Sequence, residues 1–210
     1  IEVPYDVVDM PIKLPTPRNL PAPESDAENL EAALSEAAAA INKAKKPVIV
    51  ADARARLRVF VMTISDTRTE ENDEGGRLCR QLLEEADHEV VGYVLVRDEP
   101  EVVAARVRAV AAEGHTDALI STGGTGISRR DSTFEALSAL LHKRIDGFGE
   151  LFRMLSYQEI GSAAMMSRAV GGLFGELVVF ALPGSSAAVR LGLEKLIIPE
   201  LSHLVFEKRR

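Results

Sequence analysis

From residue 57 onwards, short apolar segments alternate with amphipathic ones, and this alternation limits the possible folds more than any other feature. Strands that alternate with helices form a mainly parallel sheet with helices on both faces. We therefore predict an α/β fold, specifically a three-layer α/β/α sandwich. The predicted strands span residues 58–64, 89–96, 118–122 and 177–182; the predicted helices span 75–86, 100–113, 133–143, parts of 147–171, 186–197 and a short segment from Pro199.

The N-terminal quarter of the chain has a different character, because seven of the ten prolines lie in the first 47 residues. This density prevents regular structure over residues 11–23 and favours an extended linker. We predict a helix over 25–45 and a short strand over 47–52 after it. About five residues separate that strand from the next one, too few for a crossover between adjacent parallel strands. Either it pairs antiparallel at an edge, or an appended segment, 1–56, precedes the domain of residues 57–210.

Charge and cysteine content restrict the possible partners. The formal net charge is −7, whereas binding to a nucleic-acid backbone requires a basic surface, so we expect no nucleic-acid partner. Cys79 is the single cysteine, which excludes an intrachain disulfide and a cysteine metal site and suits a reducing compartment. No apolar run approaches the length of a membrane span. We expect a cytoplasmic protein without a membrane partner.

The strongest local signal for a binding site is the glycine-rich turn of residues 123–126, which follows a predicted strand. Its backbone amides can approach an anion closely, although such turns also occur only to reverse the chain. Ser132 and Glu135 have the spacing of a helix capping box, so Asp131 is not needed as the cap. A carboxylate beside bound phosphates is a candidate Mg²⁺ ligand.

Ligands of doubly wound α/β folds bind at the carboxyl ends of the strands. Polar or glycine-bearing loops follow four of the predicted strand ends, and we expect them to share one rim. These loops contain Ser65 and Asp66, Arg97 and Asp98, residues 122–126, and Pro183, Gly184 and Ser185.

Five short motifs follow one another in residues 57–210: TISDTRT at 63–69, GGTGISRRD at 123–131, GFGELFR at 147–153, MSR at 166–168 and LPGS at 182–185. With these motifs the segment resembles the MoaB and MogA family of molybdenum cofactor biosynthesis proteins, and the phenylalanine-bearing stretch from Gly147 points to the MoaB branch. This resemblance implies a three-layer α/β/α domain that binds molybdopterin and assembles as a homotrimer or hexamer.

The best-defined members of that family transfer AMP from ATP to molybdopterin with Mg²⁺ and release pyrophosphate. The resemblance therefore implies a molybdopterin adenylyltransferase, with Asp98 and Asp131 at the family's essential acidic positions as catalytic residues and Mg²⁺ ligands. Not all members of the MoaB branch show this activity, so the alternative is a non-catalytic molybdopterin-binding or scaffold protein. The predicted substrate-binding residues are Ser65, Asp66, Thr122, Gly123, Gly124, Thr125, Gly126, Ser167, Arg168, Pro183, Gly184 and Ser185.

Several of these residues also have a structural explanation. Asp98 would favour the positive end of the helix that begins at Pro100, and Asp66 would hydrogen-bond its own turn. Ser167 and Arg168 either line a pterin pocket or make an internal polar contact. Phe148, Leu151 and Phe152, at helical spacing, belong to the core or to a subunit interface more readily than to a ligand site. The four histidines have no spacing typical of a metal site, and we expect them at the surface.

Residues 1–56 are similar instead to thiamine-diphosphate-dependent 2-oxo acid decarboxylases, at the connector into the central domain. The cofactor-activating glutamate and the metal-diphosphate motif of those enzymes are absent from the sequence. The chain therefore resembles a fusion or engineered chimera, unless a natural extension has an accidental likeness. A decarboxylase fragment would predict affinity for thiamine diphosphate.

Overall fold

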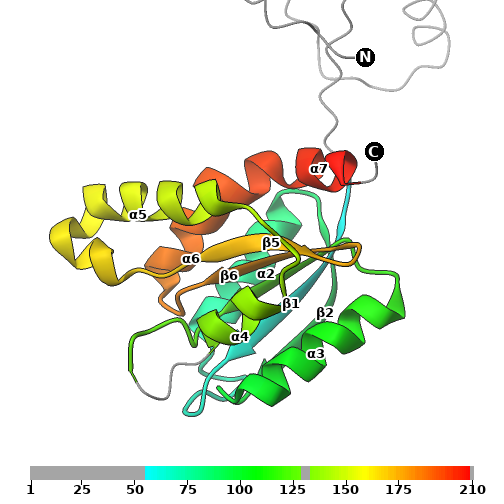
Figure 1. The fold of residues 1–210 in the computed structure, drawn as a ribbon, viewed down its shortest axis with the longest axis horizontal. Helices are drawn as coiled ribbons and strands as arrows, with labels where there is room; N and C mark the ends of the chain where they lie inside the picture. The colour runs from blue at the N-terminus through cyan, green and yellow to red at the C-terminus, as the bar shows by residue number, and fades with distance from the viewer. Residues whose placement is uncertain (1–54, 129–132, 209–210) are drawn as a thin grey trace, which may run out of the picture. The chain divides into compact units, whose positions relative to one another are not determined.

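Six strands form one sheet in the order β2-β1-β3-β6-β5-β4 in a computed structural model of the chain (Figure 1). The structure describes residues 55–128 and 133–208. Four strands are mutually parallel: β2 (Glu89–Val96), β1 (Arg58–Ile64), β3 (Ala118–Thr122) and β6 (Leu177–Leu182). Two strands extend the sheet in antiparallel pairing: β5 (Val170–Phe174) and β4 (Lys143–Arg144).

Helices cover both faces of the sheet and complete three α/β/α layers (Figure 1). One face packs against α3 (Pro100–Glu113) and α4 (Thr133–Leu140). The other face packs against α2 (Glu74–Glu85), α5 (Asp146–Ile160), α6 (Ser186–Gly192), the π-helical segment η3 (Leu193–Ile197) and α7 (Ile198–Glu207). The predicted fold class is therefore confirmed.

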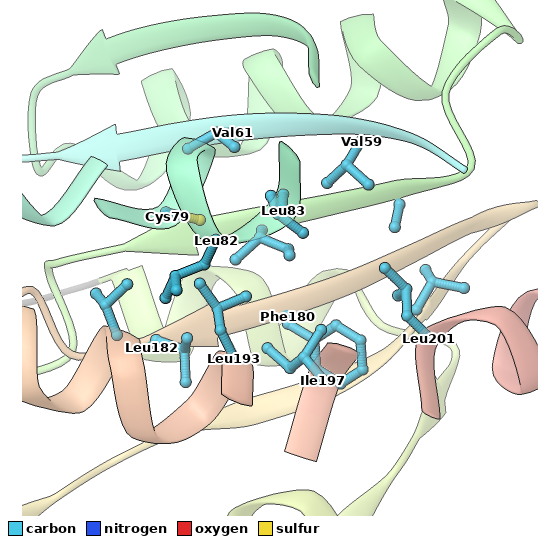
Figure 2. Close-up of a cluster of buried hydrophobic side chains, with 14 of the residues drawn as sticks. Val59, Val61, Cys79, Leu82, Leu83, Phe180, Leu182, Leu193, Ile197 and Leu201 are labelled. Carbon is cyan, nitrogen blue, oxygen red and sulfur yellow. The ribbon is translucent and has the colours of Figure 1, made fainter. Parts of the chain in front are cut away.

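The alternation of side chains along β1 shows how one strand serves both layers. Val59 and Val61 enter the core on the side of α2, whereas Phe60 and Met62 enter the core on the side of α3. Successive residues of a strand point to opposite faces, so a continuous apolar strand is what a doubly covered sheet requires. Figure 2 shows the first of these cores, where Cys79 of α2 is fully buried.

The sequence does not predict β4 and β5; it predicts helices up to residue 171, whereas β5 begins at Val170. Glycines at positions 171 and 172 lower the strand propensity of this segment. Close packing requires them: a Cβ on Gly171 would lie 2.6 Å from the ring of Phe180, and one on Gly172 would lie 2.3 Å from the Lys143 carbonyl oxygen.

The remaining elements agree with the expected ranges within a few residues. The predicted helix 133–143 ends at Leu140, and the predicted helix 186–197 is divided into α6 and η3. The predicted proline-rich linker, helix 25–45 and strand 47–52 lie outside the described residues. No helix within 55–128 and 133–208 has the length and apolarity needed to cross a membrane.

Candidate functional site

A cavity of about 580 Å³ lies at the carboxyl ends of the parallel strands, where the strand-end loops meet. Ten of the residues predicted from the sequence line it, which places the expected loops on one rim. These residues are Ser65, Asp66, Asp98, Gly123, Gly124, Thr125, Gly126, Ser167, Pro183 and Gly184. Asp131, the second predicted catalytic residue, lies outside the described residues.

The glycine-rich turn after β3 has a backbone that only glycine adopts readily. Gly123 and Gly124 have φ angles of +97° and +64°. A Cβ on Gly123 would lie 2.2 Å from the Ile64 carbonyl oxygen, and a Cβ on Gly124 would lie 2.3 Å from Thr133 Oγ1. The turn is therefore fixed tightly between β1 and the start of α4.

The amides of residues 124–126 belong to residues that line the cavity and are its candidate anion-binding groups. No backbone carbonyl within the described ranges, 55–128 and 133–208, accepts a hydrogen bond from them. Backbone amides need partners, and a run of successive amides in a turn forms a concave site for an anion. The glycines leave this backbone uncovered by side chains, so a phosphate oxygen can reach it.

Two carboxylates lie beside each other on the rim of the cavity. The Asp98 amide donates a hydrogen bond to Asp66 Oδ1 at 3.2 Å. The buried Thr133 hydroxyl donates to Asp98 Oδ1 at 2.9 Å, which orients the Asp98 carboxylate next to the glycine turn. Asp66 therefore contacts the loop after β2, whereas its structural explanation expected a hydrogen bond within its own turn, and it also lines the cavity.

The described carboxylates of the cavity do not form a complete set of metal ligands by themselves. Among the described residues, no three His, Cys, Asp or Glu side chains are placed to hold a metal by themselves. Mg²⁺ at phosphate sites commonly takes one or two carboxylates and completes its coordination with substrate oxygens and water. Asp98 beside the glycine turn matches that pattern.

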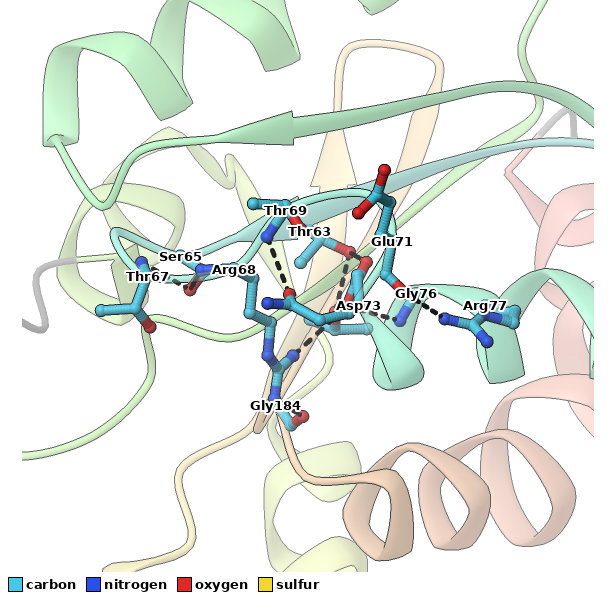
Figure 3. A network of polar contacts seen from close by, with 12 residues as sticks. Thr63, Ser65, Thr67, Arg68, Thr69, Glu71, Asp73, Gly76, Arg77 and Gly184 are labelled. Carbon is cyan, nitrogen blue, oxygen red and sulfur yellow. Dashed lines mark hydrogen bonds and ion pairs between the residues drawn. The ribbon is translucent and has the colours of Figure 1, made fainter.

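A buried carboxylate anchors the other side of the cavity (Figure 3). Asp73 is 1% exposed and accepts hydrogen bonds from Thr63 Oγ1 at 2.6 Å, Tyr93 OH at 2.7 Å and the Gly76 amide at 3.1 Å. Burial alone would raise the pKa of Asp73, but these hydrogen bonds and the charge of Arg68 hold it below its ordinary value. Asp73 is therefore ionised at neutral pH.

Arg68 is the cationic residue that the sequence interpretation did not select. Its Nη1 lies 3.3 Å from Asp73 Oδ1, its Nη2 donates to the Gly184 carbonyl at 2.8 Å, and it lines the cavity (Figure 3). The TISDTRT motif contains this residue. An arginine in a strand-end loop opposite an expected phosphate site is a signal that would have identified it.

Three of the predicted binding residues support the cavity without lining it. Thr122 is fully buried with its Oγ1 3.4 Å from that of Thr63. Ser185 caps α6 by accepting a hydrogen bond from the Ala188 amide at 3.2 Å. Arg168 makes the internal polar contact that was one of its two interpretations, because it donates from Nε to the Thr125 carbonyl at 2.8 Å.

The phenylalanines of α5 are buried, as predicted, but one of the histidines that were expected at the surface is buried too. Phe148 and Phe152 are buried core residues, as expected. His88 is buried, so its predicted surface position is wrong. Its Nδ1 accepts a hydrogen bond from the Leu57 amide at 3.4 Å, and burial lowers its pKa. The turn between α2 and β2 brings this polar ring against the start of β1.

Comparisons with known proteins match the motif-bearing part of the chain. Molybdenum cofactor biosynthesis protein B of Bacillus anthracis is 55% identical over 155 residues, which cover 73% of this chain and 92% of that protein. The Bacillus subtilis protein of the same name is 51% identical over 155 residues, 73% of this chain and 91% of its own length.

Solved structures are similar over the same extent. A crystal structure of a molybdenum cofactor biosynthesis protein B has a TM-score of 0.73 at 53% identity and covers 76% of this chain and all of its own. The tungsten cofactor synthesizing protein MoaB of Pyrococcus furiosus has a TM-score of 0.67 at 37% identity, covering 74% and 98%. Residues 60–203 match the family described as "Probable molybdopterin binding domain". The chain therefore belongs to this molybdopterin-binding family of molybdenum cofactor biosynthesis proteins, to which MoaB and MogA belong.

Proposed function

We propose that this protein acts in molybdenum cofactor biosynthesis by binding molybdopterin through its terminal phosphate in the 580 Å³ cavity. One observation carries the proposal: three successive amides, at residues 124–126, have no backbone acceptor within the described ranges and belong to residues that line the same cavity as Arg68. Amides and a guanidinium are the donors that phosphate recognition uses. The names of the relatives place them in the same biosynthetic process.

We propose further that the bound phosphate is adenylylated by ATP. The terminal phosphate of molybdopterin attacks the α-phosphate of ATP, a P–O bond to the α-phosphorus forms, and the bond to pyrophosphate breaks. The two reactants are both anions, so positioning and charge neutralisation supply most of the catalysis. No protein group needs to remove a proton, because the attacking phosphate is already ionised near neutral pH.

The side chains divide this work between the two sides of the cavity. The turn amides and Arg68 would hold phosphate oxygens, while Asp98, oriented by Thr133, would hold Mg²⁺ together with Asp131. When bound there, Mg²⁺ would supply positive charge that offsets the charge of the phosphates. The pterin would extend towards Ala163 and Met166, which form an apolar part of the lining.

Pyrophosphate release from ATP, Mg²⁺ and molybdopterin tests the catalytic proposal. We expect release by the wild type, and its loss in Asp98→Asn and Asp131→Asn. Asp146→Asn is the matched control, because Asp146 is exposed at the start of α5 and pairs only with Arg144 among the contacts of the described residues. Unchanged release in Asp98→Asn would refute its catalytic assignment. Binding of molybdopterin without release by the wild type would identify the non-catalytic alternative.

A further inference from the structure

Arg168 follows the 3₁₀ helix η2 (Gly161–Met166), and its side chain hydrogen-bonds to the glycine turn from outside the cavity. Its Nε donates to the Thr125 carbonyl at 2.8 Å, and its Nη2 donates to the Gly126 carbonyl. Nη1 forms an ion pair with Glu135 of α4. The guanidinium also lies 4.6 Å from the ring centre of Phe134. Each of its three nitrogens therefore has a protein partner.

Because the peptide group is planar, the hydrogen bonds from Arg168 to the two carbonyls also fix the directions of the N–H groups that follow them. In a trans peptide the carbonyl and the following N–H point in opposite directions, and the described residues contain no cis peptide. Because Arg168 holds the Thr125 and Gly126 carbonyls, the N–H groups of Gly126 and Ile127 point away from Arg168. Thr125 and Gly126 line the cavity, whereas Arg168 and Ile127 do not, so of these two amides we place that of Gly126 towards the cavity.

We propose that Arg168 is a positioning residue, which fixes the glycine turn so that the amide of Gly126 faces the bound phosphate, and that Glu135 holds Arg168 in place. This inference rests on the proposed function of the cavity. Arg168 does not bind the phosphate directly, since its guanidinium is already engaged with two carbonyls and a carboxylate.

The chemistry of the contact explains why arginine is required. The planar guanidinium presents five N–H groups from three nitrogen atoms in fixed directions, so it reaches two carbonyls and a carboxylate at once, whereas the three N–H groups of lysine all radiate from one nitrogen. Glu135 is 62% exposed at its side chain, where an ion pair contributes little to global stability. The effect of the pair is therefore local, on the conformation of the turn.

Calorimetric titration of the full chain with inorganic pyrophosphate tests this inference. We expect Arg168→Gln to weaken binding by about tenfold or more, and Arg168→Lys to weaken it although the charge is kept. Glu135→Gln distinguishes a positioning effect from a purely electrostatic one. Removal of a negative charge near an anion site should by itself strengthen pyrophosphate binding, whereas loss of the contact that positions Arg168 should weaken it, and we expect weaker binding. Arg190→Gln, which breaks an exposed ion pair between Arg190 of α6 and Glu194 of η3, is the matched control and should bind as the wild type does.

Hydrogen exchange of a peptide spanning residues 123–128 separates a change in the turn from a loss of global stability. We expect pyrophosphate to slow exchange in the wild type and to have little effect in Arg168→Gln. Equal affinity and equal protection in wild type, Arg168→Gln and Glu135→Gln would overturn this inference alone. Absence of any pyrophosphate binding by the wild type would overturn the proposed function as well.

Discussion

Arg68 and Gly184 are 116 positions apart in the sequence, yet Arg68 Nη2 lies 2.8 Å from the Gly184 carbonyl oxygen. This contact joins the loop after β1 to the loop after β6. Gly184 also lies close to Gly123 in the loop after β3, because a Cβ on Gly184 would lie 3.2 Å from the Gly123 Cα. One guanidinium therefore sets the width of the cavity and contributes a positive charge to it.

Replacement of Arg68 should affect both stability and binding. In Arg68→Gln, the buried Asp73 keeps its hydrogen bonds from Thr63 and Tyr93 but loses its cationic partner, so we expect a loss of about 1–3 kcal/mol in the free energy of unfolding. Affinity for pyrophosphate should fall in the same variant. Denaturant unfolding and calorimetry measure the two effects. Arg77→Gln is the control, because Arg77 makes an exposed contact with the Glu71 carbonyl; equal behaviour of both variants would contradict the role of Arg68.

Two glycine variants separate backbone strain from crowding in the turn. Gly124→Ala introduces a positive φ for alanine and places Cβ 2.3 Å from Thr133 Oγ1, so we expect destabilisation of more than about 2 kcal/mol and loss of pyrophosphate binding. Gly175→Ala has a similar φ of +58° with nothing within 4 Å of its Cβ, and should cost only about 1 kcal/mol with binding intact. Thermal unfolding compares the pair. A Gly124→Ala variant that binds normally would show that the turn tolerates a side chain.

Burial of His88 predicts a pH dependence of stability. Its folded-state pKa is lowered by burial, so as the pH falls below the unfolded value of about 6.5 the unfolded chain takes up a proton before the folded chain does. Stability should therefore decrease from about pH 6.5 downwards, above the range in which carboxylates titrate. His88→Asn, which can still accept a hydrogen bond from the Leu57 amide, should flatten this slope. Urea unfolding between pH 7.5 and 5.5 measures how the free energy of unfolding changes with pH. The same pH dependence in His88→Asn as in the wild type would contradict the assignment to His88.

Exposed apolar side chains on α5 and its continuation predict self-association, in line with the homotrimer or hexamer that the family resemblance implies. Met154, Tyr157 and Met165 are 52%, 64% and 83% exposed, and such a cluster commonly marks an interface. Tyr157→Glu should shift the sedimentation profile to smaller species. Val102→Glu, at a single exposed apolar residue on α3, should not. A monomeric wild type would contradict this prediction.

Local patterns predict most of the sheet but not its antiparallel edge. The parallel strands are buried on both faces, so their apolar runs are continuous and their limits are clear in the sequence. β5 contains Gly171 and Gly172, whose presence depends on the distant Phe180 ring and on Lys143. β4 has only two residues and exists through its pairing with β5. Neither strand has a local signal that outweighs the helical pattern before it.

Some residues of the candidate site can be predicted from the sequence, and others only from the folded structure. Glycines and acidic residues after strand ends are visible in sequence, and the parallel topology alone brings their loops together. The role of Arg68 depends on Asp73 and on the Gly184 carbonyl, so it follows only from the folded structure. Arg168 likewise contacts carbonyl groups of the turn, which no pattern of side chains indicates. The origin of residues 1–56 as a fusion stays a prediction from resemblance.

Comparison of two ligands tests the central claim most directly. Calorimetric titration of the wild type with molybdopterin and with its dephosphorylated form measures how much of the affinity depends on the terminal phosphate. If the amides of residues 124–126 and Arg68 hold that phosphate, the phosphorylated ligand should bind at least about a hundredfold more tightly, about 2.8 kcal/mol, and Gly124→Ala should remove the difference. Equal affinity of the two ligands for the wild type would contradict the account.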